Sequence, residues 1–168
     1  MKDKLIIAIK LFIIAALSGL ALFYINRITD PVIKDNRIKR EEEKYEVIFP
    51  GYDSYEKVED DITQIALYDS EKTLMGYIYS ASMNNDYGSI TLLVGISEAD
   101  EIVKVEYALL NQTPSYASKV ENDDFLGLFT LTTTSDFEDV DVKVGATYSA
   151  ATTRDLVIMI SDYHEEVK

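Results

Sequence analysis

The pattern of hydrophobic and polar positions begins with a long apolar run. Residues 5–25 read LIIAIKLFIIAALSGLALFYI, and Lys10 is their single charge. An α-helix of this length spans roughly 30 Å, the thickness of the hydrocarbon core of a bilayer. The Lys10 side chain can snorkel to the nearer interface, and the Tyr24 ring suits the other one. We therefore predict a single transmembrane anchor over residues 1–27.

The charges that flank this run predict its orientation. Lys2, Lys4 and Lys10 lie on its N-terminal side, and positive charge favours the cytoplasmic side of a membrane. We expect a single-pass protein of the cell (inner) membrane. Its N-terminus would lie in the cytoplasm, and the domain that follows the anchor would lie on the extracytoplasmic side. The alternative is a cleaved signal peptide, although the apolar region of such peptides is normally shorter, about 7–15 residues.

The pattern after the anchor predicts a connecting helix within residues 28–50. Asp30 precedes Pro31, which fits a helix N-cap followed by proline in the first turn. Intermittent apolar positions continue to Ile48, and Pro50-Gly51 would end the helix. We predict a helix from about residue 31 to residue 48, followed by a domain over residues 51–168.

The domain begins with a change toward a period of two. Residues 61–70, 73–83, 89–98 and 101–111 are rich in Ile, Val and Tyr, and short polar segments separate them. Four such strands joined by hairpin-length loops predict an antiparallel meander. Residues 116–129 predict one or two short helices with Phe125, Leu126 and Phe129 turned inward. Residues 131–145 predict a loop and a strand.

The last segment has helical spacing. From Ser149 to His164, apolar residues fall on one stripe, which is formed by Leu156, Val157, Ile160 and Tyr163. Helices and a meander that are segregated along the chain predict an α+β fold, in which the antiparallel sheet is packed with helices.

Composition then removes whole classes of function. The net charge of −14 disfavours binding to nucleic acid. The chain has no cysteine, so it has no disulfide, thiolate metal site or iron–sulfur ligation. Its single histidine, His164, excludes a histidine-rich metal site and a histidine-based catalytic triad, and its polar neighbours predict a solvent-exposed ring. We predict no metal site.

Two stretches carry residues suited to chemistry. The first, DVKVGATYSAATTRDLV, covers residues 141–157. Gly145 and Ala146 permit a close approach, Thr147 and Ser149 supply hydroxyls, and a helix begins within one turn. Free N–H groups at a helix start favour an anionic oxygen such as a phosphate oxygen. The alternative is that Thr147 or Ser149 simply caps the helix.

The second stretch, LLNQTPSYASKV, covers residues 109–120. It leaves a strand, passes through Thr113-Pro114 and enters a helix, so its polar groups could face a ligand. The alternative is an ordinary strand-to-helix loop in which Asn111 and Ser115 act as caps.

The order of several motifs is similar to that of a known family. The segments are NRITDPVI, YEVIFPGY, GYIYSASMNNDYGSITLLVGIS, NQTPSYASKV, FLGLF and DVKVGATYSAAT. In this order the chain resembles the flavin-bearing G subunit of the Rnf complex and the related C subunit of the sodium-pumping NADH:quinone reductase. The resemblance covers nearly the whole chain and implies a domain of the FMN-binding type.

The resemblance implies covalently attached FMN. In the family, a separate flavin transferase forms a phosphoester between FMN and the last threonine of the signature, which is Thr147 here. Val144 and Gln112 stand where the family has Ser/Thr and Glu. The cofactor-binding residues implied by the resemblance are Asp141, Gly145, Ala146 and Ser149 around the phosphate, and Gln112, Thr113, Pro114, Ser115, Tyr116 and Tyr87 near the flavin ring.

The resemblance also implies a function. It indicates an electron-transfer subunit of an ion-translocating ferredoxin/NAD oxidoreductase, active only with the other membrane subunits. Two alternatives of other classes remain open. One is a cofactor-free scaffold subunit, and the other is a membrane-tethered module that binds a different small ligand.

Overall fold

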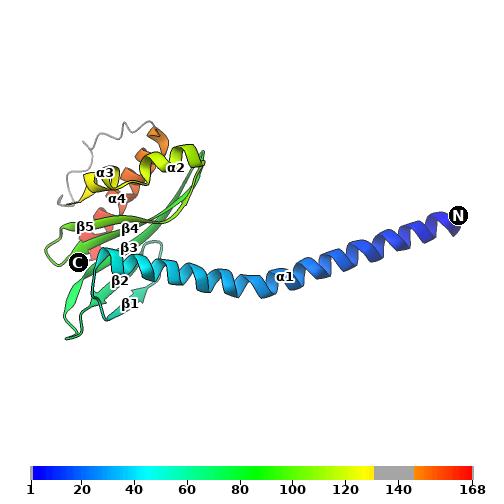
Figure 1. Cartoon of the computed structure of the whole chain (residues 1–168), viewed down its shortest axis with the longest axis horizontal. Helices are drawn as coiled ribbons and strands as arrows, with labels where there is room; N and C mark the ends of the chain where they lie inside the picture. Colours follow the sequence, from blue (N-terminus) through cyan, green and yellow to red (C-terminus); the bar gives the residue numbers. More distant parts are fainter. Residues whose placement is uncertain (1, 131–145, 168) are drawn as a thin grey trace. The chain divides into compact units, whose positions relative to one another are not determined.

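The computed structural model describes residues 2–130 and 146–167. The chain divides into two compact units, Met1–Glu41 and Glu42–Lys168. The described elements are one long helix, a five-stranded sheet and a group of helices that packs on the sheet (Figure 1). The loop and strand predicted over residues 131–145 lie outside the described residues, and so do the first five residues, 141–145, of the stretch that ends at residue 157.

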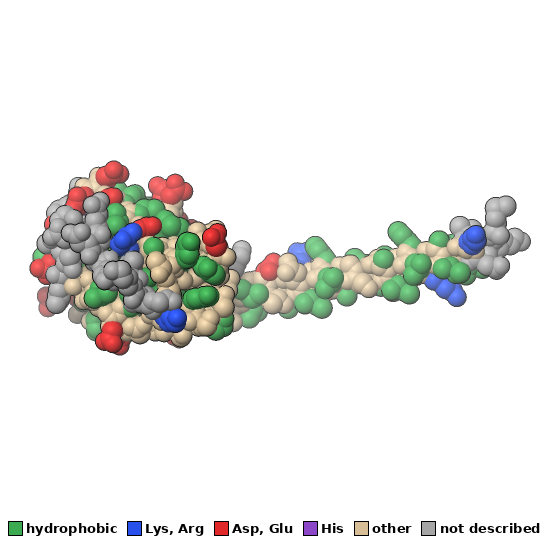
Figure 2. Space-filling view, turned by 90° about the horizontal axis from the view of Figure 1, so that it is seen from above, with side chains coloured by type: hydrophobic (Ala, Val, Ile, Leu, Met, Phe, Trp, Pro, Cys, Tyr) green, Lys and Arg blue, Asp and Glu red, His purple; other side chains and the backbone are tan. Residues whose placement is uncertain are grey.

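Helix α1 (Lys2–Ile48) begins with the predicted apolar segment. Its most hydrophobic 18-residue window has a mean hydropathy of 2.5, and none of that window is buried. Figure 2 shows hydrophobic side chains projecting along this helix into the surroundings. Their exposure is high, for example 73% for Phe12 and 68% for Leu22. The helix is long and apolar enough to cross a membrane, as the sequence predicted.

The predicted helix start at Pro31 is wrong, because α1 runs through Pro31 without a break. The residues before Pro31 are already helical, so Asp30 has no free helix start to cap. Its carboxylate instead accepts a hydrogen bond of 3.0 Å from Nδ2 of Asn26, one turn earlier. A proline inside a helix removes one backbone hydrogen bond and costs about 3 kcal/mol. The helix continues through Pro31 despite this cost.

The sheet is the predicted antiparallel meander. Its strands are β1 (Ser54–Val58), β2 (Thr63–Tyr68), β3 (Leu74–Asn85), β4 (Gly88–Ser97) and β5 (Ile102–Asn111), and they lie side by side in chain order. Alternating positions or continuous apolar runs rich in Ile, Val and Tyr predicted β2 to β5. They missed β1, because all five residues of this edge strand are exposed and therefore show no alternation.

Four helical segments cover one face of the sheet. They are α2 (Pro114–Val120), α3 (Asp123–Leu126), the 3₁₀ turn η1 (Gly127–Phe129) and α4 (Thr147–Val167). Figure 1 shows them gathered on the same side of the strands. The α+β prediction is confirmed, and so are the inward-facing residues that it named, of which the fully or nearly fully buried ones are Phe125, Leu126, Phe129, Leu156, Val157 and Ile160.

The C-terminal end of α1 packs on the other face of the sheet. Tyr45, Ile48 and Phe49 form a second core with apolar side chains from β2, β3 and β4. Two strand glycines make room for them. A Cβ atom at Gly76 would lie 2.7 Å from Cζ of Phe49, and a Cβ at Gly95 would lie 3.2 Å from Cε2 of the same ring. The glycines of the Gly-Tyr and Val-Gly-Ile strand motifs therefore leave the space that the Phe49 ring of the Phe-Pro-Gly segment occupies.

Candidate functional site

Helix α4 starts at the residue that the resemblance marks for attachment. The carbonyl oxygen of Ala146 accepts a hydrogen bond of 2.9 Å from the N–H of Ala150, so Ala146 occupies the N-cap position and Thr147 the first helical position. The alternative that Thr147 or Ser149 is the N-cap is therefore wrong. Backbone N–H groups in this first turn have no acceptor within the helix, and the helix dipole places positive potential there.

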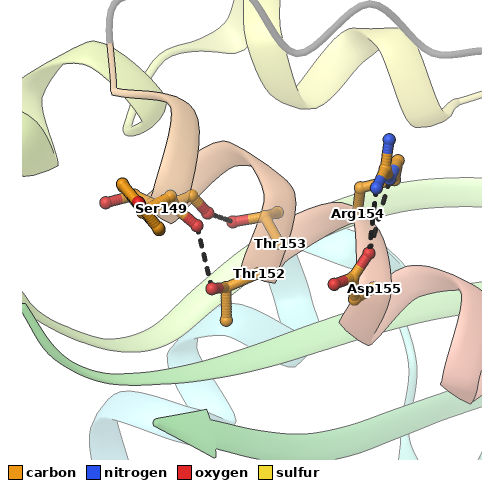
Figure 3. Close-up of polar contacts among 6 residues, drawn as sticks. Ser149, Thr152, Thr153, Arg154 and Asp155 are labelled. Carbon is orange, nitrogen blue, oxygen red and sulfur yellow. Dashed lines mark hydrogen bonds and ion pairs between the residues drawn. The ribbon is translucent and has the colours of Figure 1, made fainter. Parts of the chain in front are cut away.

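Exposure separates the hydroxyls of this stretch. Among its described serine and threonine residues, Thr147 is exposed, whereas Ser149 is 1%, Thr152 7% and Thr153 0% exposed. Thr152 and Thr153 donate hydrogen bonds of 2.9 Å to the carbonyl oxygens of Tyr148 and Ser149 (Figure 3). Thr147 is thus the hydroxyl in this group that a large modifying group can approach without unfolding the helix.

A hollow lined by tyrosine rings lies beside Thr147. Its volume is about 200 Å³, and it is lined by Tyr87, Tyr116, Ala146, Thr147, Tyr148 and Ser149. The ring centroids of Tyr87 and Tyr116 are 5.0 Å apart, and those of Tyr87 and Tyr148 are 5.7 Å apart. The three rings come from the β3–β4 turn, α2 and α4, so the fold brings together aromatic residues that are distant in sequence. The three rings are close enough to contact one another, and they give the hollow an aromatic lining against which a planar ligand can pack.

A hydrogen-bonded network fixes the walls of this hollow. The Ser149 hydroxyl donates to Oε1 of Gln112 at 2.6 Å, and Nε2 of Gln112 donates to Oδ1 of Asn85 at 2.9 Å. Nδ2 of Asn85 in turn donates to Oγ1 of Thr152 at 3.0 Å. The network joins α4, the segment after β5 and the end of β3. It is complete only with an amide at position 112, because a carboxylate has no N–H to donate.

Asn85 is the residue of this site that the sequence analysis missed. Its Oδ1 also accepts the backbone N–H of Tyr87 at 2.9 Å, which fixes the two-residue turn that presents the Tyr87 ring. The turn is closed by Gly88, whose φ of 134° lies in a region that favours glycine. An asparagine immediately before Asp-Tyr-Gly is a turn signal, and that signal could have identified it.

The loop before α2 contributes less than predicted. Thr113 is the N-cap of α2 and Pro114 its first residue, and no side-chain capping bond is present, so the capping roles predicted for Asn111 and Ser115 are wrong. The carbonyl oxygen of Thr113 accepts the N–H groups of Tyr116 and Ala117 at 2.9 and 3.0 Å. Thr113, Pro114 and Ser115 are exposed and do not line the described hollow, whereas Tyr116 does.

The structure therefore gathers a subset of the predicted site residues. Tyr87, Tyr116, Ala146, Thr147 and Ser149 line one hollow, and Gln112 is hydrogen-bonded to its wall. Asp141, Val144 and Gly145 lie outside the described residues.

The buried side chain of Tyr107 on β5 contacts the first turns of α4. The hydroxyl of Tyr107 lies 2.9 Å from Oγ1 of Thr153, and burial raises the pKa of Tyr107. The hydroxyl stays protonated at neutral pH and holds the first turns of α4 against β5.

The solvent-exposed ring predicted for His164 is wrong. His164 is 3% exposed. Its Nδ1 lies 2.8 Å from the hydroxyl of Tyr79, and its Nε2 lies 3.0 Å from Oδ1 of Asp100. The physical reason is periodicity, because His164 follows Ile160 by one helical turn on the face of α4 that packs against the sheet. Its acidic sequence neighbours concealed that position.

Comparison with known proteins supports the resemblance seen in the motifs. No protein-family model matches the chain. The chain is 24% identical over 113 residues to a protein of Clostridium ljungdahlii that is named as the G subunit of a proton-translocating ferredoxin:NAD(+) oxidoreductase complex. The alignment covers 67% of this chain and 60% of the relative, so the match spans less than two thirds of the relative's length. The predicted similarity to an Rnf G subunit is confirmed.

Proposed function

We propose that this protein is an electron-transfer subunit of an Rnf-type membrane complex and carries FMN as a phosphoester on Thr147. The observation that carries the proposal is the exposed Thr147 hydroxyl at the start of α4, beside a hollow lined by three tyrosine rings. The named relative, a G subunit of a ferredoxin:NAD(+) oxidoreductase complex, supports the same assignment.

The residues around Thr147 fit a phosphate. The N–H groups in the first turn of α4 and the positive end of its dipole stabilise anionic oxygens. Ala146 is the N-cap, and its methyl side chain accepts no hydrogen bond from these N–H groups. The attachment forms a bond from phosphorus to Oγ1 of Thr147 and breaks the bond from phosphorus to the leaving group of the flavin donor, which departs with the proton of the Thr147 hydroxyl. A separate flavin transferase catalyses this transfer.

The residues around the hollow fit a planar ring. Tyr87, Tyr116 and Tyr148 provide aromatic faces, and the network through Gln112 and Asn85 holds the turn that carries Tyr87 before any ligand arrives. When bound, the flavin would supply the electron-transfer chemistry, and the protein supplies position and environment. The resemblance adds Asp141 and Gly145, which lie outside the described residues, to the proposed phosphate site.

The rest of the chain fits a subunit rather than a complete enzyme. A single apolar helix can anchor the domain, but one span forms no ion pathway. We propose that other membrane subunits contribute the ion pathway, the electron donor and the electron acceptor. The domain would lie on the extracytoplasmic side, with the segment over residues 1–27 as anchor, 28–50 as connection and 51–168 as the FMN-binding domain.

In-gel fluorescence tests the attachment. The full chain is co-expressed with an active flavin transferase, denatured and separated by electrophoresis. We expect a fluorescent band that Thr147→Val abolishes and that the matched variant Thr73→Val, at an exposed threonine in the β2–β3 turn, retains.

The other outcomes identify the alternatives. Absence of fluorescence while the transferase modifies a known substrate in the same cells contradicts the proposal and favours the cofactor-free scaffold. Flavin that copurifies but is released on denaturation contradicts covalent attachment and favours a module that binds its ligand non-covalently.

A further inference from the structure

A second hollow lies toward the other end of α4 from Thr147. It is formed where the end of α4 meets β3 and the β4–β5 turn, and its volume is about 420 Å³. That volume falls within the range of about 300–1,000 Å³ that is typical of small-molecule sites. His164 lines this hollow, and at 1.5 Å per residue it lies about 25 Å along the helix from Thr147. The hollow is therefore separate from the proposed flavin site.

A buried chain of hydrogen bonds forms the floor. Nε2 of Gln64 donates to the hydroxyl of Tyr79 at 3.2 Å. An amide nitrogen has no lone pair to offer, so the Tyr79 proton is directed to Nδ1 of His164, at 2.8 Å. Nε2 of His164 then carries the ring proton and donates to Oδ1 of Asp100 at 3.0 Å. Burial raises the pKa of Tyr79 to about 12, so its hydroxyl remains a donor at neutral pH.

The donor-to-acceptor direction of these hydrogen bonds decides which polar groups of the hollow remain available to a ligand. The ring N–H of His164 and the O–H of Tyr79 are both used within the floor. The carboxylates of Glu98 and Asp100 also line the hollow. The Ser97 hydroxyl lines it as well and accepts the backbone N–H of Glu101 at 3.3 Å. No lysine or arginine is among the described residues that line it. A ligand that donates hydrogen bonds and carries positive charge is therefore favoured, and an anion is repelled.

The remaining lining residues are suited to an apolar body. The side chains of Leu74 and Val167 border the hollow together with the ring of Tyr77. The Tyr77 ring centroid lies 6.2 Å from that of His164, and a tyrosine face attracts a cation that lies within about 6 Å of it. A metal ion is a poorer match, because the described residues contain no group of three or more His, Asp or Glu side chains that could hold one.

We propose that this hollow binds a primary alkylammonium ion. The ammonium group donates hydrogen bonds to the carboxylates of Glu98 and Asp100, and the alkyl chain packs against Tyr77, Leu74 and Val167. The proposal is independent of the flavin, because none of these residues lines the hollow beside Thr147.

The single histidine provides the probe. Because His164 is the only histidine in the sequence, the full chain labelled with ¹³C-histidine in neutral detergent micelles gives one imidazole spin system. It is titrated at constant pH and ionic strength with n-butylammonium, n-butanol and butyrate, which share one length and differ in charge. We expect a saturable shift with n-butylammonium, with a Kd of the order of 1 mM. We expect no saturable shift with the alcohol or the carboxylate.

Two matched variants complete the test. Glu98→Gln should weaken n-butylammonium binding about fivefold, the effect of removing one exposed charge partner. Glu43→Gln removes an exposed carboxylate from α1 and should leave the Kd unchanged. The proposal is overturned by a linear response to n-butylammonium, by equal binding of n-butanol, or by equal weakening in the two variants, which would reveal only the general attraction of an acidic protein for cations.

Discussion

The hydroxyl of Ser149 donates a 2.6 Å hydrogen bond to Oε1 of Gln112, and both residues are buried. This contact joins the first turn of α4 to the segment that follows β5. Because Nε2 of Gln112 continues the network to Asn85, the positions of Thr147 and Tyr87 depend on one amide side chain.

Replacement of Gln112 should therefore loosen the wall of the hollow. Gln112→Leu leaves the Ser149 hydroxyl and the Asn85 carbonyl without this partner, and a buried polar group that loses its partner costs about 1–3 kcal/mol. We expect the free energy of unfolding, measured by urea denaturation of the full chain in detergent, to fall by about that amount.

Gln112→Glu provides the matched comparison. It keeps an acceptor for Ser149, but it places a carboxylate oxygen against Oδ1 of Asn85 and buries a negative charge, so its loss of stability should be at least as large as that of Gln112→Leu. Equal stability of the wild type and both variants would show that the network does not hold this part of the domain together.

The packing of the C-terminal end of α1 against the sheet should be disturbed by one added methyl group. A Cβ at Gly95 collides with the side chain of Ile48 and lies 3.2 Å from Cε2 of Phe49. Overpacking of a close-packed core costs about 1–3 kcal/mol, so Gly95→Ala should lower the free energy of unfolding by that much. Gly127→Ala is the control, since nothing lies within 4 Å of the Cβ position there. Equal effects of the two substitutions would contradict this packing.

Stability should decline at alkaline pH. Burial raises the pKa of Tyr79 from 10.0 to about 12 and raises that of Tyr107 as well. Above pH 10 the unfolded chain loses these protons while the folded chain retains them, so rising pH favours unfolding. The stability contribution is complete below pH 10 and disappears as the pH passes through the folded-state values.

Urea denaturation between pH 8 and pH 11 measures this decline. Tyr107→Phe removes one of the two groups and should flatten the slope above pH 10. Its cost at neutral pH should be about 0.5–1.5 kcal/mol, because Thr153 still donates to the carbonyl oxygen of Ser149. An unchanged alkaline slope in this variant would contradict the role given to burial of Tyr107.

The elements that the sequence predicted carry a periodic apolar pattern or a continuous apolar run. Strands β2, β3 and β5 alternate in part between buried and less buried residues, whereas β4 is buried over most of its length. The stripe that includes Leu156 and Ile160 buries one side of α4. The exposed edge strand β1 had no such signal. Pro31 gave a false signal, because a proline can begin a helix or lie inside one, and only the helical context on both sides distinguishes the two.

The site was predictable only in part for a related reason. Local patterns indicated Thr147 as one of several hydroxyls and could not exclude capping. The buried partners of Ser149, Thr152 and Thr153 come from elsewhere in the structure or from the helix backbone, and they distinguish Thr147 from the others. Asn85 carries a local turn signal and His164 lies one helical turn after Ile160, but their hydrogen-bond partners come from other elements, and no local pattern encodes those tertiary contacts.

The central claim concerns one oxygen atom, and peptide mass spectrometry tests it most directly. Trypsin cleavage after Lys143 and Arg154 releases the peptide VGATYSAATTR, which contains Thr147 together with Ser149, Thr152 and Thr153. After co-expression with the transferase, we predict that this peptide gains the mass of one FMN less one water, and that its fragment ions assign the addition to Thr147. An addition at any other residue, or an unmodified peptide from cells whose transferase modifies a known substrate, would contradict the account.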